Sequence, residues 1–277
     1  MIVVTGSGGQ LGSAFRRHLT DDAVYLDRSV VDLQERGAAG AAIRDIEPTV
    51  VINCAAYTAV DRAERDEKTA ERVNAWAVQE LALACRDVGA RLVTFSTDYV
   101  FDGEKEGSYV ESDSTNPLNA YGRTKQLAES LVLAADPTAL IVRTSWLLSG
   151  THHNFLTKMV GLIAQQTVTV VDDQFGHPTF AGDLVEASLA AIQAEATGLL
   201  HLTNTGTTTW FELARLIATA AGLDENRVLP CATSEFPAVA LRPRNSVLGS
   251  DRRELLGIDE LPHFGETLER TLSQIER

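Results

Sequence analysis

Cysteine and long apolar runs are scarce in this chain. Its 277 residues include three widely spaced cysteines, Cys54, Cys85 and Cys231, which exclude a disulfide framework and a zinc knuckle and favour buried free thiols. No apolar stretch approaches the roughly 20 residues that cross a bilayer, so we expect no membrane span. The chain enters an apolar segment without the basic start of a secretory signal, which favours a cytoplasmic protein.

Positively charged residues are also scarce relative to acidic ones. Against 38 acidic residues stand 24 lysines and arginines, giving a formal net charge of -14. General binding to nucleic acid is excluded, because a phosphate backbone requires a basic face. One small anion can still bind to backbone N–H groups at a helix N-terminus and to a few arginines. Only four residues are lysine, so the position of Lys125 is informative.

Apolar segments of strand length alternate with helical patterns in the first half of the chain. We expect strands at 2–5, 23–26, 50–54, 92–96 and 140–143, with helices at 11–19, 40–46, 70–88 and 121–134. Strands that are apolar nearly throughout, separated by helices, predict a doubly wound parallel sheet of the Rossmann type, an α/β fold.

The second half predicts a smaller C-terminal lobe. Helices are expected at 154–165, 181–194 and 210–221, strands at 167–171 and 199–203, and a turn-rich stretch at 230–243. We therefore predict a dinucleotide-binding domain over 1–148, to which 181–204 returns. Residues 149–180 and 205–277 would form the substrate-binding lobe, and ligands usually bind in the cleft between two such lobes.

A glycine-rich turn follows the first expected strand. Gly6, Gly9 and Gly12 have the spacing G-x-x-G-x-x-G and open the first helix, the context that a phosphate-binding turn requires. Gly6 permits the tight turn, Gly9 lets the backbone approach a diphosphate, and Gly12 allows the helix to pack closely on the strand. The sequence thus predicts a dinucleotide site here.

The end of the second strand leaves the cofactor open. Asp27 is placed to bind the adenosine ribose hydroxyls, which favours NADH, whereas the guanidinium of Arg28 could accept the 2′-phosphate of NADPH. We expect NADH or NADPH, with a slight preference for NADH. Asp32 and Leu33 either flank the adenine or form a solvated loop.

Tyr121 and Lys125 lie four residues apart and therefore on one helix face. Reducing a ketone requires a proton for the developing alkoxide, and a nearby ammonium group lowers a tyrosine pKa and can hold the nicotinamide ribose. Thr97 ends an apolar strand and could hydrogen-bond the substrate carbonyl. Asp98, next to it, is either an acceptor for a substrate hydroxyl or a strand-end cap. These residues predict a nicotinamide-dependent reductase.

Longer motifs then narrow the class. Over essentially its whole length the chain resembles the extended short-chain dehydrogenase/reductases and, within them, the dTDP-4-dehydrorhamnose reductase family. The motifs that carry the resemblance are Gly6-x-x-Gly9-Gln10-Leu11-Gly12, Asn53-Cys54-Ala55-Ala56-Tyr57-Thr58-Ala59-Val60-Asp61, Ser96-Thr97-Asp98-Tyr99-Val100-Phe101, Tyr121-Gly122-x-x-Lys125, Arg143-Thr144-Ser145-Trp146, Asn154-Phe155 and Arg242-Pro243.

The resemblance implies roles for individual residues. Tyr121 donates the proton and Thr97 and Asp98 hold the keto sugar. Trp146 packs against the hexose, with a core aromatic as the alternative, while Trp210 is expected in the core. Arg242 contacts the nucleotide or its diphosphate, and Asn154 belongs to the substrate site. The cofactor site is implied to include Gly6, Gly9, Gln10, Leu11, Gly12, Asp27, Arg28, Asp32, Leu33, Ala55, Ala56, Tyr57, Thr58, Phe95, Tyr121 and Lys125.

The reaction implied by the family is reduction of the C4 ketone of dTDP-4-dehydro-6-deoxy-L-mannose to dTDP-L-rhamnose. The alternatives are a reductase of another dTDP-4-keto-6-deoxyhexose and a non-catalytic, cofactor-binding regulatory subunit. Some family members form magnesium-bridged dimers through glutamates on the first helix, where this chain has Ser13, Arg16 and Arg17. We therefore expect a monomer or a weak homodimer. The adjacent His152 and His153 point apart, and we assign no metal.

Overall fold

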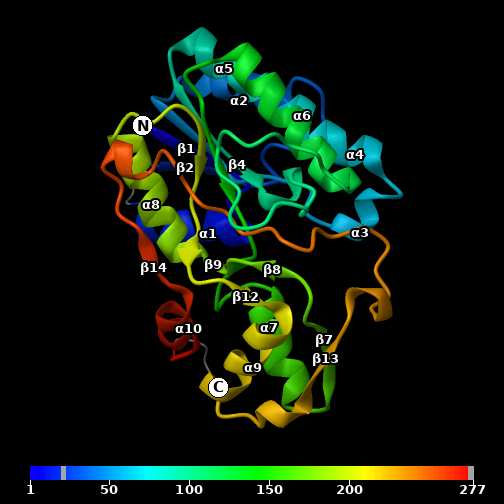
Figure 1. Cartoon of the computed structure of the whole chain (residues 1–277). Helices are drawn as coiled ribbons and strands as arrows, with labels where there is room; N and C mark the ends of the chain where they lie inside the picture. Colours follow the sequence, from blue (N-terminus) through cyan, green and yellow to red (C-terminus); the bar gives the residue numbers. More distant parts are fainter. Residues whose placement is uncertain (20–22, 274–277) are drawn as a thin grey trace.

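The large sheet confirms the predicted fold class. The structure is a computed structural model that describes residues 1–19 and 23–273. Six strands pair in the order β10-β5-β4-β3-β1-β2, and every pairing is parallel; Figure 1 labels β1, β2 and β4. They are β1 (Ile2–Thr5), β2 (Ala23–Leu26), β3 (Val50–Asn53), β4 (Arg91–Thr97), β5 (Leu140–Thr144) and β10 (Gly198–His201).

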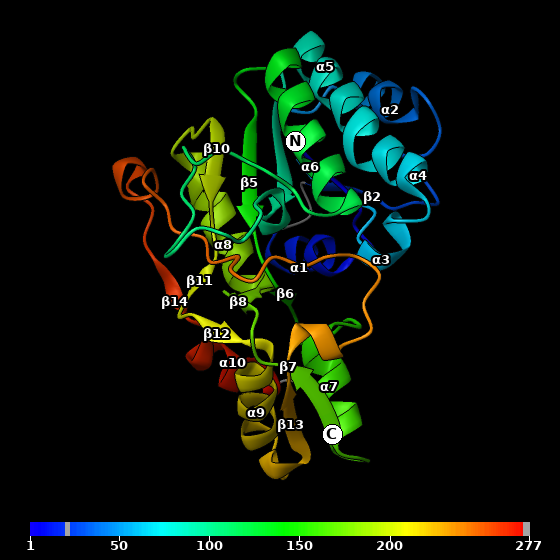
Figure 2. The same ribbon diagram turned by 45° about the vertical axis from the view of Figure 1, so that its right-hand side comes forward.

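Helices cover both faces of this sheet because alternate strand residues point to opposite sides. On one face, Val51 and Leu92 pack with α2, α5 and α6. On the other, Ile52 and Val93 pack with α1 and α8 (Figure 2). The helices are α1 (Gln10–His18), α2 (Ala38–Ile46), α3 (Val60–Ala63), α4 (Glu67–Glu71), α5 (Ala77–Val88), α6 (Ala120–Ala135) and α8 (Ala181–Gln193).

A second apolar cluster lies below the large sheet in Figure 1. It joins α7 and α9 to a two-stranded parallel sheet of β7 and β13. Its elements include α7 (Phe155–Ile163), β7 (Val168–Val171), α9 (Trp210–Ala220), β13 (Val228–Cys231) and α10 (Phe264–Ser273), with the short strands β6 (Leu147–Leu148), β8 (Phe175–Gly176), β9 (Thr179–Phe180), β11 (Asn204–Thr205), β12 (Thr208–Thr209) and β14 (Leu261–His263).

Two local predictions need correction. The stretch expected to be turn-rich, 230–243, begins inside β13, where Pro230 and Cys231 pair with Val170 and Val171 of β7. The helix expected at 70–88 instead begins at Glu67 and passes through a π-helical segment, Arg72–Trp76, before α5. Both features depend on partners distant in sequence. Across residues 1–19 and 23–273, no helix is both long and apolar enough to span a membrane.

Candidate active site

The glycine turn between β1 and α1 is a cradle of bare backbone. Gly6 has φ +65°, a conformation that suits glycine, and a Cβ there would lie 2.5 Å from the backbone nitrogen of Ala55. A Cβ on Gly12 would meet the Gly6 carbonyl, so the start of α1 packs directly on the turn. The first turn of α1 carries no acidic side chain. Its exposed N–H groups fit an anionic diphosphate.

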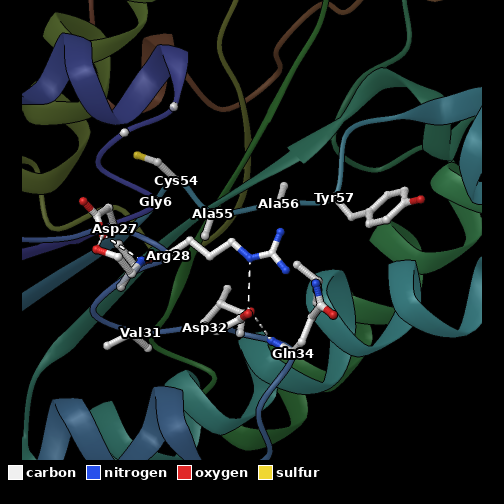
Figure 3. Close-up of a pocket in the computed structure, with 16 residues that line it drawn as sticks. Gly6, Asp27, Arg28, Val31, Asp32, Gln34, Cys54, Ala55, Ala56 and Tyr57 are labelled. Atoms are coloured by element: carbon white, nitrogen blue, oxygen red, sulfur yellow. Dashed lines mark hydrogen bonds and ion pairs between the residues drawn. The ribbon is translucent and has the colours of Figure 1, made fainter.

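A pocket of about 470 Å³ continues from this turn along the ends of β1, β2 and β3 (Figure 3). It brings together most of the side chains expected to hold a cofactor. The predicted residues that line it are Gly6, Gly9, Asp27, Arg28, Asp32, Leu33, Ala55, Ala56 and Tyr57, and Gly8, Ser29, Val31, Gln34, Cys54 and Val73 were not predicted.

The acid and the base at the end of β2 are both already engaged. Asp27 accepts hydrogen bonds from the Ser29 hydroxyl at 2.6 Å and the Ser29 amide at 2.8 Å, and these bonds lower its pKa. Arg28 Nε donates to Asp32 at 3.2 Å, and Figure 3 shows the Arg28 side chain between Asp32 and the segment Ala55–Tyr57. A cofactor ribose would therefore compete with Ser29 for Asp27, whereas a 2′-phosphate would compete with Asp32 for Arg28.

Seven of the predicted cofactor residues lie outside this pocket lining: Gln10, Leu11, Gly12, Thr58, Phe95, Tyr121 and Lys125. Leu11 is buried in the core beneath α1, and Thr58 is exposed. Gln10 accepts a hydrogen bond from Asn154 at 2.9 Å, which links α1 to the start of α7. Phe95 packs its ring against Phe15. Phe95 contributes its carbonyl oxygen instead, which accepts a hydrogen bond from Lys125.

β4 and α6 bring the three predicted catalytic side chains to one edge of the sheet. Thr97 is the last residue of β4, and its hydroxyl donates to Asp98 Oδ1 at 2.9 Å. Asn119 caps α6 by accepting from the Gly122 amide at 2.8 Å. A Cβ on Gly122 would meet the Tyr99 carbonyl, so glycine allows α6 to lie close to the end of β4. This contact sets Tyr121 beside Thr97.

The electrostatics of Tyr121 correct one prediction. Burial and the neighbouring Asp98 raise the pKa of Tyr121 above its ordinary value, and a hydrogen bond with Thr97 partly offsets this. The sequence predicted that Lys125 would lower it. Instead Lys125 Nζ donates to the Phe95 carbonyl at 2.5 Å, and burial lowers its own pKa to about 8. In this state, therefore, the phenol holds its proton firmly at neutral pH.

Asp98 combines a raised pKa with a buried carboxylate oxygen that has no hydrogen-bond partner among the described residues. Burial raises its pKa to about 6, and hydrogen bonds from Ser246 and Thr97 oppose the rise. Within the described residues its Oδ2 is buried without a hydrogen-bond partner. Since the Thr97 side chain already caps the following turn, Asp98 is free to accept from a ligand hydroxyl. Ser246, over a hundred residues away in sequence, was missed because no local signal connects it to this strand.

A second pocket, of about 600 Å³, lies in the lower part of the molecule. Its wall carries Tyr99 and Arg242 at the end near Thr97, and Phe155 and Trp210 on the side of α7 and α9. Gln174 is buried in the same wall and donates to Thr233 at 3.0 Å. Apolar walls with a few polar groups suit a nucleotide base or sugar.

The structure redistributes the roles expected of four residues near this pocket. Trp146 lies outside its lining, buried and stacked on Trp210 with ring centroids 3.6 Å apart. Trp210, expected in the core, is only partly buried and lines the pocket. Arg242 is also in the lining, but its guanidinium makes two 3.1 Å hydrogen bonds to Asp61. Asn154 caps α7 through its side-chain oxygen.

No group of three or more histidine, cysteine or acidic side chains that could hold a metal ion occurs within the described ranges 1–19 and 23–273. The polar side chains that the structure brings to this edge of the sheet are Thr97, Asp98, Tyr121 and Lys125. A phosphate-binding turn, a dinucleotide pocket and a threonine, tyrosine and lysine at the carboxyl edge of a parallel sheet define an extended short-chain dehydrogenase/reductase.

Comparison with known proteins gives the family. The family model described as the RmlD substrate binding domain matches residues 1–277, and the chain belongs to this family. It is 43% identical over 286 residues to dTDP-4-dehydrorhamnose reductase of Mycobacterium tuberculosis, covering 98% of this chain and 92% of that protein. It is 41% identical over 271 residues to dTDP-4-keto-6-deoxy-D-glucose reductase of Streptomyces niveus, covering 96% of this chain and 94% of that protein.

Solved structures agree with the sequence comparison. The crystal structure of dTDP-4-dehydrorhamnose reductase from Bacillus anthracis in complex with NADP matches with a TM-score of 0.95 at 36% identity, covering 99% of this chain and 98% of that one. The resemblance to this family predicted from the sequence motifs is confirmed.

Proposed function

We propose that this protein reduces the C4 ketone of dTDP-4-dehydro-6-deoxy-L-mannose with NADPH or NADH, giving dTDP-L-rhamnose. The observation that carries the proposal is the grouping of Thr97, Asp98, Tyr121 and Lys125 at the sheet edge next to the dinucleotide pocket. The names of the relatives support the keto sugar as substrate, and the bound NADP in the Bacillus anthracis structure supports the cofactor.

The cofactor would be held by the glycine turn, by Asp27 or Arg28 at the adenosine end, and by the segment from Ala55 to Tyr57. The bound nicotinamide supplies the hydride. The chain's own part is to bind the ketone and to supply one proton. Thr97 can hydrogen-bond the sugar oxygen, and Asp98 Oδ2 can accept from a sugar hydroxyl.

Tyr121 donates its phenol proton to the oxygen as the alkoxide develops. Its raised pKa keeps the phenol protonated before the reaction. The tyrosinate left behind needs a cation nearby, and Lys125 is the ammonium on the same helix face. Lys125 is pinned to the Phe95 carbonyl, so it is positioned before the substrate arrives.

The second pocket supports a nucleotide-linked substrate. Trp210 and Phe155 offer flat apolar surfaces to a base, with ring centroids 4.5 Å apart.

We propose the division into a dinucleotide-binding domain, 1–148 with 181–204, and a substrate-binding lobe, 149–180 with 205–277. We further propose a cytoplasmic enzyme acting as a monomer or weak homodimer; Ser13, Arg16 and Arg17 on α1 support the absence of a carboxylate-bridged dimer.

The test is NADPH and NADH oxidation with dTDP-4-dehydrorhamnose, followed by NMR of the product's C4 configuration. Replacing Tyr121 by Phe should lower kcat by about 10²-fold or more, because proton transfer by a positioned side chain contributes that much. The matched control is Tyr25→Phe on β2, whose hydroxyl donates to the Leu19 carbonyl away from the site. Near-normal turnover by Tyr121→Phe would refute the assignment.

A second candidate, reduction of another dTDP-4-keto-6-deoxy sugar, is favoured by the 41% identity to the Streptomyces niveus enzyme. A panel of dTDP-4-keto sugars separates the two candidates by relative kcat/KM and by product configuration. Binding of NADPH without oxidation by any of these sugars would support a non-catalytic subunit instead.

A further inference from the structure

Glu129 on α6 is a buried carboxylate close to Lys125 that the proposed reaction does not use. Glu129 follows Lys125 by one turn of α6 and is 6% exposed. Its Oε1 accepts from Ser96 Oγ at 2.5 Å and from Arg143 Nε at 2.9 Å, and its Oε2 accepts from Arg143 Nη2 at 2.7 Å. A bidentate guanidinium pair of this kind fixes both partners in orientation.

Arg143 is itself held from the far side. Its Nη1 lies 3.3 Å from His201 Nε2, while His201 Nδ1 lies 2.8 Å from the Gly249 carbonyl. A carbonyl only accepts, so Nδ1 carries the proton and Nε2 accepts from Arg143. Burial, followed by the charge of Arg143, lowers the pKa of His201 to about 4, so the ring is neutral at pH 7. The cluster of Ser96, Glu129, Arg143 and His201 thus adds one negative charge and one positive charge near Lys125.

The cluster and the catalytic lysine meet on β4. Lys125 Nζ donates to the carbonyl of Phe95, and Ser96, the next residue, donates to Glu129. Ser96 directly precedes Thr97, so one strand end carries the lysine's anchor, the carboxylate's anchor and the hydroxyl expected to bind substrate. Glu129 opposes the effect of burial on the charge of Lys125.

Resting on the proposed reductase function, we propose that Glu129 is a positioning residue: clamped by Arg143 and Ser96, it holds Lys125 as an ammonium ion against the Phe95 carbonyl. Arg143 on β5 pairs with Glu129, and His201 on β10 contacts Arg143. Toward the active site, Tyr121 lies one turn before Lys125 on α6, and the charge of Asp98 acts on Tyr121. Without the carboxylate, the buried ammonium would keep the Phe95 carbonyl as an acceptor but would lose the negative charge that opposes the effect of burial. It would therefore lose its proton more readily.

The scarcity of lysine makes a direct test practical. Only Lys68, Lys105, Lys125 and Lys158 would give signals in protein labelled with ¹³C at lysine Cε, and Lys125→Arg assigns the one of interest. In the wild type we expect Lys125 to titrate near pH 8. Glu129→Gln should move this midpoint down by about one pH unit, as loss of an opposite charge predicts.

Kinetics give an independent measurement. The alkaline limb of the kcat profile should move down with the Lys125 midpoint in Glu129→Gln. At pH 7.5 the fraction of ammonium, and with it kcat, should fall about threefold for a midpoint moving from about 8 to about 7. The KM for the keto sugar should stay within about twofold, since Glu129 touches neither pocket.

Two further variants separate charge from packing. Glu129→Asp keeps the charge, so its Lys125 midpoint should stay close to wild type even if the protein is less stable. Glu111→Gln removes another buried carboxylate, one that binds Ser250 Oγ at 2.6 Å and the His201 amide at 2.8 Å, and should leave Lys125 unchanged.

An unchanged Lys125 midpoint in Glu129→Gln, or an equal shift in Glu111→Gln, would overturn the proposal. Should Glu129→Gln fail to fold, a neutral Lys125 at pH 7 in the wild type, or a Glu129→Asp midpoint well below the wild-type value, would overturn it as well. The lysine titration requires no turnover. Failure of the reductase assignment would therefore appear in the keto-sugar assay alone.

Discussion

At the scale of single residues, Gly12 lets the backbone of α1 approach the glycine turn more closely than any side chain would allow. Gly12 has no Cβ, and any Cβ there would meet the Gly6 carbonyl and lie 2.7 Å from Ser7 Cα. These are backbone atoms, which cannot turn aside as a side chain does. The turn that is expected to hold a diphosphate is thus specified by the smallest residue in the sequence.

Replacing Gly12 by Ala should therefore push α1 away from the turn. We expect a loss of about 1–3 kcal/mol in the free energy of unfolding, typical of overpacking, and a Kd for NADPH raised at least tenfold. Urea unfolding and fluorescence titration measure the two effects. Gly161→Ala is the control: this exposed helical glycine has open space at its Cβ, and alanine there should stabilise α7 by about 0.5–1 kcal/mol. Tight NADPH binding by Gly12→Ala would contradict this account.

Many residues of the candidate site could be predicted from the sequence because their signals are local. Gly6, Asp27 and Lys125 sit in fixed relation to a strand end or to a helix turn, and spacing alone reveals such positions. Ser246, whose hydroxyl lowers the pKa of Asp98, could not be found in this way. The Arg242 pairing with Asp61 joins residues 181 positions apart and was also invisible.

At the scale of elements, the π-helical segment before α5 serves the active-site side of the molecule. It places Asn74, which is fully buried, where its Oδ1 accepts from the Tyr57 amide at 2.7 Å. Its Nδ2 lies 3.1 Å from the Tyr57 carbonyl and 3.0 Å from Thr124 Oγ1 on α6. One amide thus ties the loop after β3, which lines the dinucleotide pocket, to the helix that carries Tyr121. Single-turn π-helical segments are frequent at functional sites.

Asn74→Ala should leave the Tyr57 amide and carbonyl without their partners. Unpaired buried polar groups cost about 1–3 kcal/mol each, so we expect the free energy of unfolding to fall by about 2–4 kcal/mol and cofactor affinity to fall with it. Asn226→Ala is the matched control, because Asn226 is exposed and its side chain donates to the neighbouring Asp224. Equal urea midpoints for the two variants would show that the clamp is unimportant.

The limits of prediction at this scale also follow distance along the chain. The six strands of the large sheet and most of the longer helices arise from local apolar periodicity and were predicted within a few residues, whereas the short helix α3 and the helix α10 were not predicted. The two-residue strands β6, β8, β9, β11 and β12 exist only through their partners: β12, for example, pairs with β8 more than 30 residues earlier. The π-helical segment has the same cause, since Asn74 is held by Tyr57 and Thr124.

At the scale of the whole molecule, the buried histidine predicts sensitivity to acid. Burial and Arg143 lower the pKa of His201 to about 4, against about 6.5 in an unfolded chain. Between these values the unfolded state binds more protons, so stability is complete above about pH 6.5 and is lost as the pH falls toward 4. The loss from this residue amounts to about 3 kcal/mol.

His201→Gln should therefore flatten the fall in unfolding free energy between pH 7 and pH 4.5, measured by urea denaturation at several pH values. Asp98 has a raised pKa, so its contribution decreases as the pH rises and runs in the opposite direction. The difference between the variant and the wild type isolates His201. His153→Gln, at an exposed position, is the control. An unchanged acid slope in His201→Gln would exclude this source of acid sensitivity.

The strand order of the large sheet has a consequence for synthesis on the ribosome. β10 occupies the edge beside β5, yet it lies more than 50 residues after β5 in the chain. While residues 145–197 are still being made, the nascent sheet ends in β5, whose five residues are all buried in the finished protein. An unpaired edge of this kind, which is buried in the folded protein, invites pairing with other chains. Slow translation through this interval would therefore prolong the period in which a growing polypeptide is most prone to aggregate, and chaperones would be needed most just before Gly198 emerges.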